Sequence, residues 1–183
     1  MPKPLLLVID AQQGFREADY WGSSANPKAL SNIETLVSAF RSKGLPIAVV
    51  KHNSKNPNSP LHSGNKGNQL EPFLDGVREV VIQKSVNSAF YGSPDLQHWL
   101  TDRGYRRLII CGITTNFCCE TTARMAGNLG YEVDFVLDAT DAFDAVSPSG
   151  ERISGSEVMK MTATNLNGEF ARVLNTEELL AEL

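Results

Sequence analysis

Short apolar runs alternate with helical patterns along most of the chain, and this alternation limits the possible folds more than any other feature of the sequence. Strands that alternate with helices are typical of a parallel sheet whose faces are covered by helices. The sequence therefore predicts a three-layer α/β/α Rossmann-like fold around a mostly parallel sheet of about six strands. The expected strands are residues 5–9, 46–50, 79–83, 107–111 and 132–137, with a short edge strand at 170–174.

Capping residues and prolines between these runs mark the expected helix boundaries. An Asn-Pro pair at 26–27 and a Ser-Pro pair at 93–94 each place a capping residue before a proline that suits the first turn. Residues 52–70 are rich in Asn, Ser, Pro and Gly and lack periodicity, so we expect a long loop there, a candidate lid over one end of the sheet. The expected helices span 26–43, 93–103, the segment after the fourth strand, 154–167, and a terminal helix from 176.

The composition favours a single domain over residues 1–183, because 42% hydrophobic and 21% charged residues suffice for a substantial core. A net charge of -4 and a pI near 5.4 do not favour general binding to nucleic acid or to an anionic membrane. The apolar run at 5–9 is too short for a signal peptide or a membrane span. Three cysteines, two of them adjacent, are a poor disulfide framework and indicate a reducing compartment. We therefore expect a cytoplasmic protein that acts on a small molecule.

The segment GITTNFCCETTARMA, at residues 112–126, joins the fourth expected strand to a helix. The first turn of a helix carries unpaired backbone N–H groups and a partial positive charge. A thiol at this place is expected to shift toward thiolate, and the N–H groups can receive an oxyanion. This segment is therefore predicted to supply both a nucleophile and its anion hole.

Two adjacent cysteines, Cys118 and Cys119, compete for the role of nucleophile. Successive helical residues lie about 100° apart, so the two thiols face different directions. Glu120 and Arg124, spaced for an i,i+4 ion pair, mark the solvent side, whereas Cys119 falls on the opposite side with small apolar residues. We therefore predict Cys118 as the nucleophile and interpret Cys119 and Cys111 as structural residues.

Three groups with complementary chemistry follow different strands. Asp10 ends the first strand, Lys84 follows the third, and Cys118 lies on the helix after the fourth. Binding sites of open parallel sheets form outside the carboxyl ends of the strands, so these residues are expected to converge. A nearby ammonium would stabilise the Cys118 thiolate. Asp10 would accept the thiol proton, hold the lysine, and later pass the proton to a leaving group or take one from water. Taken singly, the aspartate is more often a turn cap and the lysine a solvated side chain.

Three segments resemble, in order, the motifs of the isochorismatase-like cysteine hydrolase family, which includes nicotinamidases, N-carbamoylsarcosine amidases and isochorismatases. They are LLLVIDAQQGF at 5–15, KSVNSAFYGSPDL at 84–96 and CGITTNFCCETTARMAGNLGYEVDFVLDAT at 111–140. The resemblance spans nearly the whole chain. It implies the same three-layer fold and a hydrolytic activity.

The resemblance also assigns roles to individual residues. It implies that Asp10, Lys84 and Cys118 form a catalytic triad. It further implies a cis peptide bond between Ile113 and Thr114, whose turn lets the N–H groups of Thr114 and Cys118 face the oxyanion. Members of the family assemble as dimers or larger oligomers, so a homodimer or higher homo-oligomer is expected.

Five further residues are candidates for the substrate pocket. Phe15, Trp21 and Phe90 are expected to form an apolar wall, although aromatic residues near strand ends are as often part of the core. Gln12 and Asn116 are expected to orient polar groups of the substrate, or else to satisfy the backbone of turns.

His52 is the histidine placed at a strand end and is a further pocket candidate. Zinc-containing nicotinamidases of the family carry an aspartate two residues before the corresponding histidine, where this chain has Val50. His62 alone does not complete the three protein ligands that a catalytic zinc requires. We therefore expect neither a metal nor another cofactor. The loops at 52–70 and 144–152 are expected to shape the pocket.

The function predicted from the sequence is hydrolysis of a small amide, carbamoyl or related acyl compound by a cysteine, through a thioester intermediate. The alternative within the family is hydrolysis of a vinyl ether, as in isochorismatases, by acid catalysis that needs no cysteine. A non-catalytic α/β binding module is a third hypothesis. The chain lacks the GxGxxG and GxxxxGK[ST] phosphate loops that such a module often carries.

Overall fold

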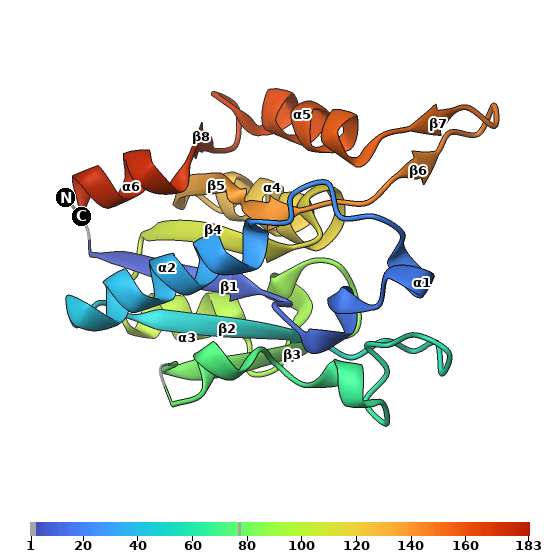
Figure 1. The fold of residues 1–183 in the computed structure, drawn as a ribbon. Helices are drawn as coiled ribbons and strands as arrows, with labels where there is room; N and C mark the ends of the chain where they lie inside the picture. The colour runs from blue at the N-terminus through green and yellow to red at the C-terminus, as the bar shows by residue number, and fades with distance from the viewer. Residues whose placement is uncertain (1–2, 77) are drawn as a thin grey trace.

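The computed structural model describes residues 3–76 and 78–183 and shows a six-stranded sheet between layers of helices (Figure 1). Every pair of neighbouring strands in this sheet is parallel, so the predicted three-layer α/β/α fold is confirmed. In their order across the sheet the strands are β3 (Val80–Lys84), β2 (Ile47–His52), β1 (Pro4–Ile9), β4 (Arg107–Ile113), β5 (Glu132–Asp141) and β8 (Arg172–Leu174).

Helices cover both faces of the sheet, with α2 and α6 on one face and α3, α4 and α5 on the other (Figure 1). A separate antiparallel hairpin joins β6 (Ala145–Val146) to β7 (Arg152–Ile153). None of the helices within residues 3–76 and 78–183 combines the length and the apolar character needed to cross a membrane. The helices are α1 (Ala18–Trp21), α2 (Ala29–Ser42), α3 (Leu96–Asp102), α4 (Glu120–Asn128), α5 (Gly155–Leu166) and α6 (Thr176–Glu182).

The alternation of side chains along β1 divides the core between the two faces. Leu5, Leu7 and Ile9 pack with residues of α3 and α4, whereas Leu6 and Val8 pack with residues of α2. All five side chains are completely buried. A central parallel strand is buried on both faces, which explains why the sequence of β1 is continuously apolar instead of alternating.

Two helices begin later than the sequence predicts, because the expected caps have other partners. The side chain of Asn26 donates to backbone carbonyls of β5, and α2 begins only at Ala29. The 93–94 Ser-Pro bond is cis and precedes the helix, and Asp95 is the residue that caps α3 by accepting a hydrogen bond from the N–H of His98. The predicted helices at 154–167 and from 176 are confirmed, each opened by a capping box.

The junction between β4 and β5 differs from the prediction and lies beside the site. The register of this pair shifts between Ile110 and Gly112, and β5 continues to Asp141 instead of ending at residue 137. Gly112 has a φ of 134°, and a Cβ built on it would lie 1.9 Å from the carbonyl oxygen of Ile9. Only glycine therefore lets β4 approach the end of β1 this closely.

The loop at 52–70 is anchored by a buried asparagine rather than by regular structure. The loop holds one 3₁₀ turn, Lys66–Asn68, and the Asn68 side chain donates to the carbonyl oxygens of His52 and Leu61. The loop, α1 and the β6–β7 hairpin all lie at the end of the sheet where the parallel strands terminate (Figure 1). These three segments therefore surround the carboxyl edge of the sheet.

Candidate active site

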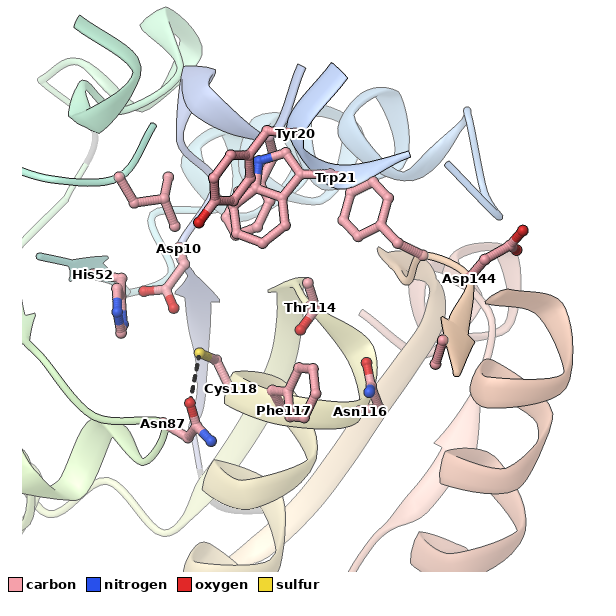
Figure 2. A pocket seen from close by; sticks show the side chains of 14 residues that line it. Asp10, Tyr20, Trp21, His52, Asn87, Thr114, Asn116, Phe117, Cys118 and Asp144 are labelled. Carbon is pink, nitrogen blue, oxygen red and sulfur yellow. Dashed lines mark hydrogen bonds between the residues drawn. The ribbon is translucent and has the colours of Figure 1, made fainter. Parts of the chain in front are cut away.

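Asp10 marks the carboxyl end of β1 and has an unusual backbone conformation. Its φ of 50° lies in the left-handed region, which aspartate tolerates better than most residues. Its N–H donates to the carbonyl oxygen of Val50 on β2, and its side chain is completely buried. Figure 2 shows the carboxylate directed toward Cys118. The turn after β1 thus places a buried acid next to the predicted nucleophile.

Lys84, the last residue of β3, connects the groups at this edge. Its Nζ donates to Asp10 Oδ2 at 2.6 Å and to Cys118 Sγ at 3.2 Å, and it lies 3.1 Å from Nδ1 of His52. Burial lowers the pKa of Lys84, but Asp10 and Cys118 raise it by more, so the net direction is upward and the amine is an ammonium. The structure therefore brings Asp10, Lys84 and Cys118 together, as their places after the strand ends predicted.

The Cys118 thiol rests in its protonated form, which corrects the expectation of a thiolate at a helix start. Burial raises the pKa of Cys118 to about 12; Asp10 adds to this increase and Lys84 opposes it. The thiol faces the pocket and lies 3.8 Å from Oδ1 of Asn87 (Figure 2). A neutral resting thiol favours loss of its proton during attack on a substrate over loss before it.

The neighbouring cysteines occupy the core. Cys119 and Cys111 are completely buried, and burial raises the pKa of each thiol. Neither lines the pocket that Cys118 faces. The predicted ion pair between Glu120 and Arg124 is also present, at 2.8 Å. The helical face assignment that separated Cys118 from Cys119 thus agrees with the burial of the two thiols.

The two carboxylate oxygens of Asp10 differ in their hydrogen bonding. Oδ1 is buried and has no hydrogen-bond partner within residues 3–76 and 78–183, whereas Oδ2 accepts from Lys84. A buried carboxylate oxygen without a partner is costly, and such exceptions often mark functional groups. Oδ1 is therefore available to accept a proton.

The turn after β4 has the conformation that the resemblance implied. The Ile113–Thr114 peptide bond is cis, and a π-helical turn, Thr115–Cys119, follows it and leads into α4. Thr114 and Cys118 both line the pocket. The role of their N–H groups as oxyanion donors stays a prediction.

A pocket of about 480 Å³ lies above the thiol. One wall consists of three neighbouring aromatic rings, in which the centroid of Trp21 lies 4.8 Å from that of Phe15 and 5.7 Å from that of Phe143. The indole N–H of Trp21 donates to the carbonyl oxygen of Gly14, which fixes the orientation of this ring. The pocket thus joins an apolar wall to a polar floor around Cys118.

The structure places four of the six predicted pocket residues in this lining: Phe15, Trp21, His52 and Asn116. Gln12 and Phe90 lie elsewhere, and both expectations were wrong. Gln12 is completely buried and uses its amide to hold the backbone of the neighbouring strand. Phe90 packs in the core, with its ring centroid 5.9 Å from that of Tyr131.

Several residues that line the pocket were not predicted from the sequence. Phe143 follows β5 and would have been recognised if that strand had been extended to Asp141. Asn87 lies three residues after Lys84, and no local pattern distinguishes it from other loop residues. Of the two loops expected to shape the pocket, each contributes only a small part. The lining residues not predicted individually are Tyr20, Leu61, Asn87, Phe117, Phe143, Asp144 and Ala145.

Asp10, His52 and Cys118 also meet the spacing of a metal site, because one ligand atom of each lies within 4.8 Å of the others. The ammonium of Lys84, however, contacts one side-chain atom of each of these residues and is the positive charge at this place. Val50, at the position of the missing aspartate ligand, is completely buried in the core. These residues therefore do not fit a resident metal ion.

The fold and the pocket together define a class of protein. A buried thiol, ammonium and carboxylate meet at the carboxyl edge of a parallel α/β sheet, which is where enzymes of this architecture bind their substrates. A family model described as "Isochorismatase domain" matches residues 4–177. The chain belongs to the isochorismatase family of hydrolases.

Known relatives agree with this assignment over nearly the full chain. The isochorismatase family protein YrdC of Bacillus subtilis is 32% identical, with 97% of this chain and 95% of that protein covered. Nicotinamidase 3 of Arabidopsis thaliana is 31% identical, with 97% and 87% covered. The crystal structure of an isochorismatase-family protein from Chromobacterium violaceum has a TM-score of 0.90 and 38% identity, with 98% of this chain and 92% of that chain covered.

Proposed function

We propose that this protein is a metal-independent cysteine hydrolase that cleaves a small, uncharged amide, carbamoyl or related acyl compound through a thioester. The contact of Lys84 with both Asp10 and Cys118, beneath the pocket, carries the proposal. Nicotinamidase 3, whose name is that of an amide hydrolase, supports cleavage of a carbon–nitrogen bond. The three residues act as a catalytic triad.

The first half of the reaction transfers the acyl group to sulfur. The Cys118 thiol attacks the carbonyl carbon, and its proton passes to Asp10. The N–H groups of Thr114 and Cys118 hold the oxyanion that forms. When the intermediate collapses, the carbon–nitrogen bond breaks and Asp10 donates the same proton to the departing nitrogen. The products of this half are a neutral amine or ammonia and a thioester on Cys118.

The second half returns the enzyme to its starting state. Asp10 is again a carboxylate and accepts a proton from a water molecule as that water attacks the thioester. The carbon–sulfur bond then breaks, and the proton on Asp10 passes to the sulfur of Cys118. Lys84 stays an ammonium throughout and stabilises negative charge as it develops on sulfur 3.2 Å away. One water is consumed, and the acid is released.

The charge of the pocket disfavours the vinyl ether alternative. Isochorismate is a dicarboxylate, and the sites that bind carboxylates usually present arginine or lysine. Among the described residues that line the pocket there is neither, since the Lys84 side chain is completely buried behind Asp10 and Cys118. Asp144 adds a carboxylate to the lining. An uncharged substrate therefore fits this pocket better than an anionic one.

A substrate screen with paired cysteine variants tests the proposal. Purified protein is incubated with small uncharged amides and ureides, with carboxylated analogues of the same compounds, and with isochorismate, and ammonia or acid release is measured. We expect release from an uncharged compound, loss of that activity in Cys118→Ala, and retention in the matched control Cys119→Ala. Mass spectrometry of acid-quenched enzyme should find the acyl group on the peptide that contains Cys118. Activity that survives Cys118→Ala would refute the cysteine mechanism.

Two properties expected from the sequence stay predictions. These are the homo-oligomeric state and the cytoplasmic location. Light scattering of the purified protein measures the first of them.

A further inference from the structure

We propose that His52 is a positioning residue that works as a neutral imidazole: its Nδ1 accepts a hydrogen bond from Lys84, and its Nε2–H donates into the pocket to an acceptor atom of the substrate. The inference rests on the proposed function for the second of these roles only. The first role is a property of the resting protein and is tested without a substrate.

The contacts of Lys84 determine which nitrogen of His52 carries the proton. An ammonium has three N–H donors and no acceptor. Asp10 and Cys118 receive two of these donors, and Nδ1 of His52, 3.1 Å from Nζ, is the third partner. Nδ1 must therefore be unprotonated, which leaves the proton of the neutral ring on Nε2. The imidazole thus completes the hydrogen bonding of a buried ammonium.

The environment keeps this imidazole neutral. Burial lowers the pKa of His52, Lys84 lowers it further, and Asp10 opposes both. The charged and titratable groups that face the ring are Asp10 after β1, Lys84 at the end of β3 and the thiol of Cys118. A protonated ring would place an N–H against the Lys84 ammonium, so protonation would break their contact.

Two buried amides hold His52 in this place. Gln12 accepts a hydrogen bond from the backbone N–H of His52 at 2.8 Å and donates to its carbonyl oxygen at 3.0 Å. Asn68 donates to the same carbonyl oxygen, also at 3.0 Å. Gln12 and Asn68 are 0% and 4% exposed, so neither amide is free to reorient. Gln12 therefore serves the pocket indirectly, by fixing the residue that faces it.

The other ring nitrogen is free to act on a ligand. His52 lines the pocket (Figure 2), and Nε2 has no protein hydrogen-bond partner in the described part of the chain. A partnerless nitrogen that was also buried would resemble Oδ1 of Asp10. Nε2 is not buried in this way, so it is open to the pocket. Because Nε2 carries the proton, this side of the pocket offers a donor and favours substrates with an acceptor there.

Nuclear magnetic resonance of the histidine rings tests the tautomer directly. The chain has three histidines, so the His52 signals are assigned by their absence in His52→Gln. In ¹⁵N-labelled wild-type protein, long-range ¹H–¹⁵N spectra should show the Nε2–H tautomer at pH 7, and the ring should titrate below pH 6.5, the ordinary value for histidine. A ring that is protonated on Nδ1 at pH 7, or that titrates at or above pH 6.5, would overturn the inference whatever the activity of the protein.

Two substitutions separate the two roles, because each amide replaces one ring nitrogen. In His52→Asn the side-chain oxygen lies near the position of Nδ1, so the acceptor for Lys84 is kept. In His52→Gln the longer side chain places its amide near the position of Nε2, so the donor to the substrate is kept. We expect His52→Asn to leave the rate of Cys118 alkylation within about twofold of wild type and to raise KM about tenfold, as for loss of one hydrogen bond. We expect His52→Gln to preserve KM within about threefold and to slow alkylation.

The pattern across these variants decides the proposal. His52→Ala removes both groups and should show both defects, and circular dichroism confirms that each variant is folded. If His52→Asn slows alkylation as much as His52→Ala, Nδ1 is not the partner of Lys84 and the inference fails. If no substrate is found, the alkylation and tautomer measurements still test the contact with Lys84, so failure of the proposed function is distinguishable from failure of this inference.

Discussion

Replacement of Asp10 by asparagine should have opposite effects on alkylation and on turnover. Asparagine keeps an oxygen that can accept the hydrogen bond of Lys84 but removes the negative charge. Because Asp10 raises the pKa of Cys118, its loss lowers that pKa from about 12. The same substitution removes the group that accepts the thiol proton in the proposed mechanism. Asp10→Asn should therefore make a more reactive thiol in a less active enzyme.

The size of the first effect follows from the geometry. The facing atoms of Asp10 and Cys118 lie within 4.8 Å. With an effective dielectric constant of about 20, two unit charges at that distance interact by about 3.5 kcal/mol, which corresponds to about 2.5 pKa units. A thiolate with a lower pKa is also a weaker nucleophile, and this offsets about half of the gain in logarithmic rate. Alkylation at fixed pH should therefore be about 20-fold faster than in wild type.

The assay compares two rates in the same preparations. Iodoacetamide labelling of the Cys118 peptide is followed by mass spectrometry between pH 7 and 10, with Cys119→Ala as the control for site assignment and circular dichroism as the control for folding. Turnover, measured on a substrate from the screen, should fall by about 10² to 10⁴, the usual loss for a general base. Alkylation that is unchanged or slower in folded Asp10→Asn would refute the account of the thiol pKa, and unchanged turnover would remove Asp10 as the base.

Three further perturbations have definite expected outcomes. Lys84→Met removes the charge that lowers the Cys118 pKa, so alkylation at pH 8 should slow by about tenfold or more; an unchanged rate in a folded variant contradicts the electrostatic role. Asp134→Ala leaves the nearly buried Arg107 without its main partner and should cost about 3–5 kcal/mol in urea denaturation, while alkylation of the folded protein stays as in wild type. Prolonged chelation should leave activity unchanged, because the Lys84 ammonium is the cation at this site. A loss of activity that added zinc reverses would contradict this.

The parallel topology explains why so much was predictable from the sequence. In a parallel sheet all strands end at one edge, so the positions of Asp10 and Lys84 at strand ends were enough to predict that they meet. The choice of Cys118 over Cys119 needed only the angular spacing of helical residues, and it agrees with the burial of Cys119. Both inferences depend on regular backbone geometry, which short-range patterns specify well.

Features that depend on three-dimensional packing were not predictable in the same way. The hydrogen bonds that determine the role of Gln12 join residues 40 and 56 positions apart, and no local pattern distinguishes them from contacts to a substrate. Phe90 lies near a strand end, as a pocket residue would, but its ring faces Tyr131 and the core. The extension of β5 to Asp141 follows a register shift next to Gly112, which is visible only once β4 and β1 are placed together.

The thiol itself shows how burial reverses a local rule. A cysteine at the start of a helix is expected to have a lowered pKa, because the N–H groups and the helix dipole favour the thiolate. Here the thiol is 8% exposed and faces the Asp10 carboxylate, and both conditions favour the neutral form. A resting thiol beside a carboxylate suits a reaction in which the proton must later be returned to a departing nitrogen. If Cys118 had lost that proton to solvent before the substrate bound, Asp10 would have none to donate, so the neutral thiol supplies the acid that cleavage of the carbon–nitrogen bond requires.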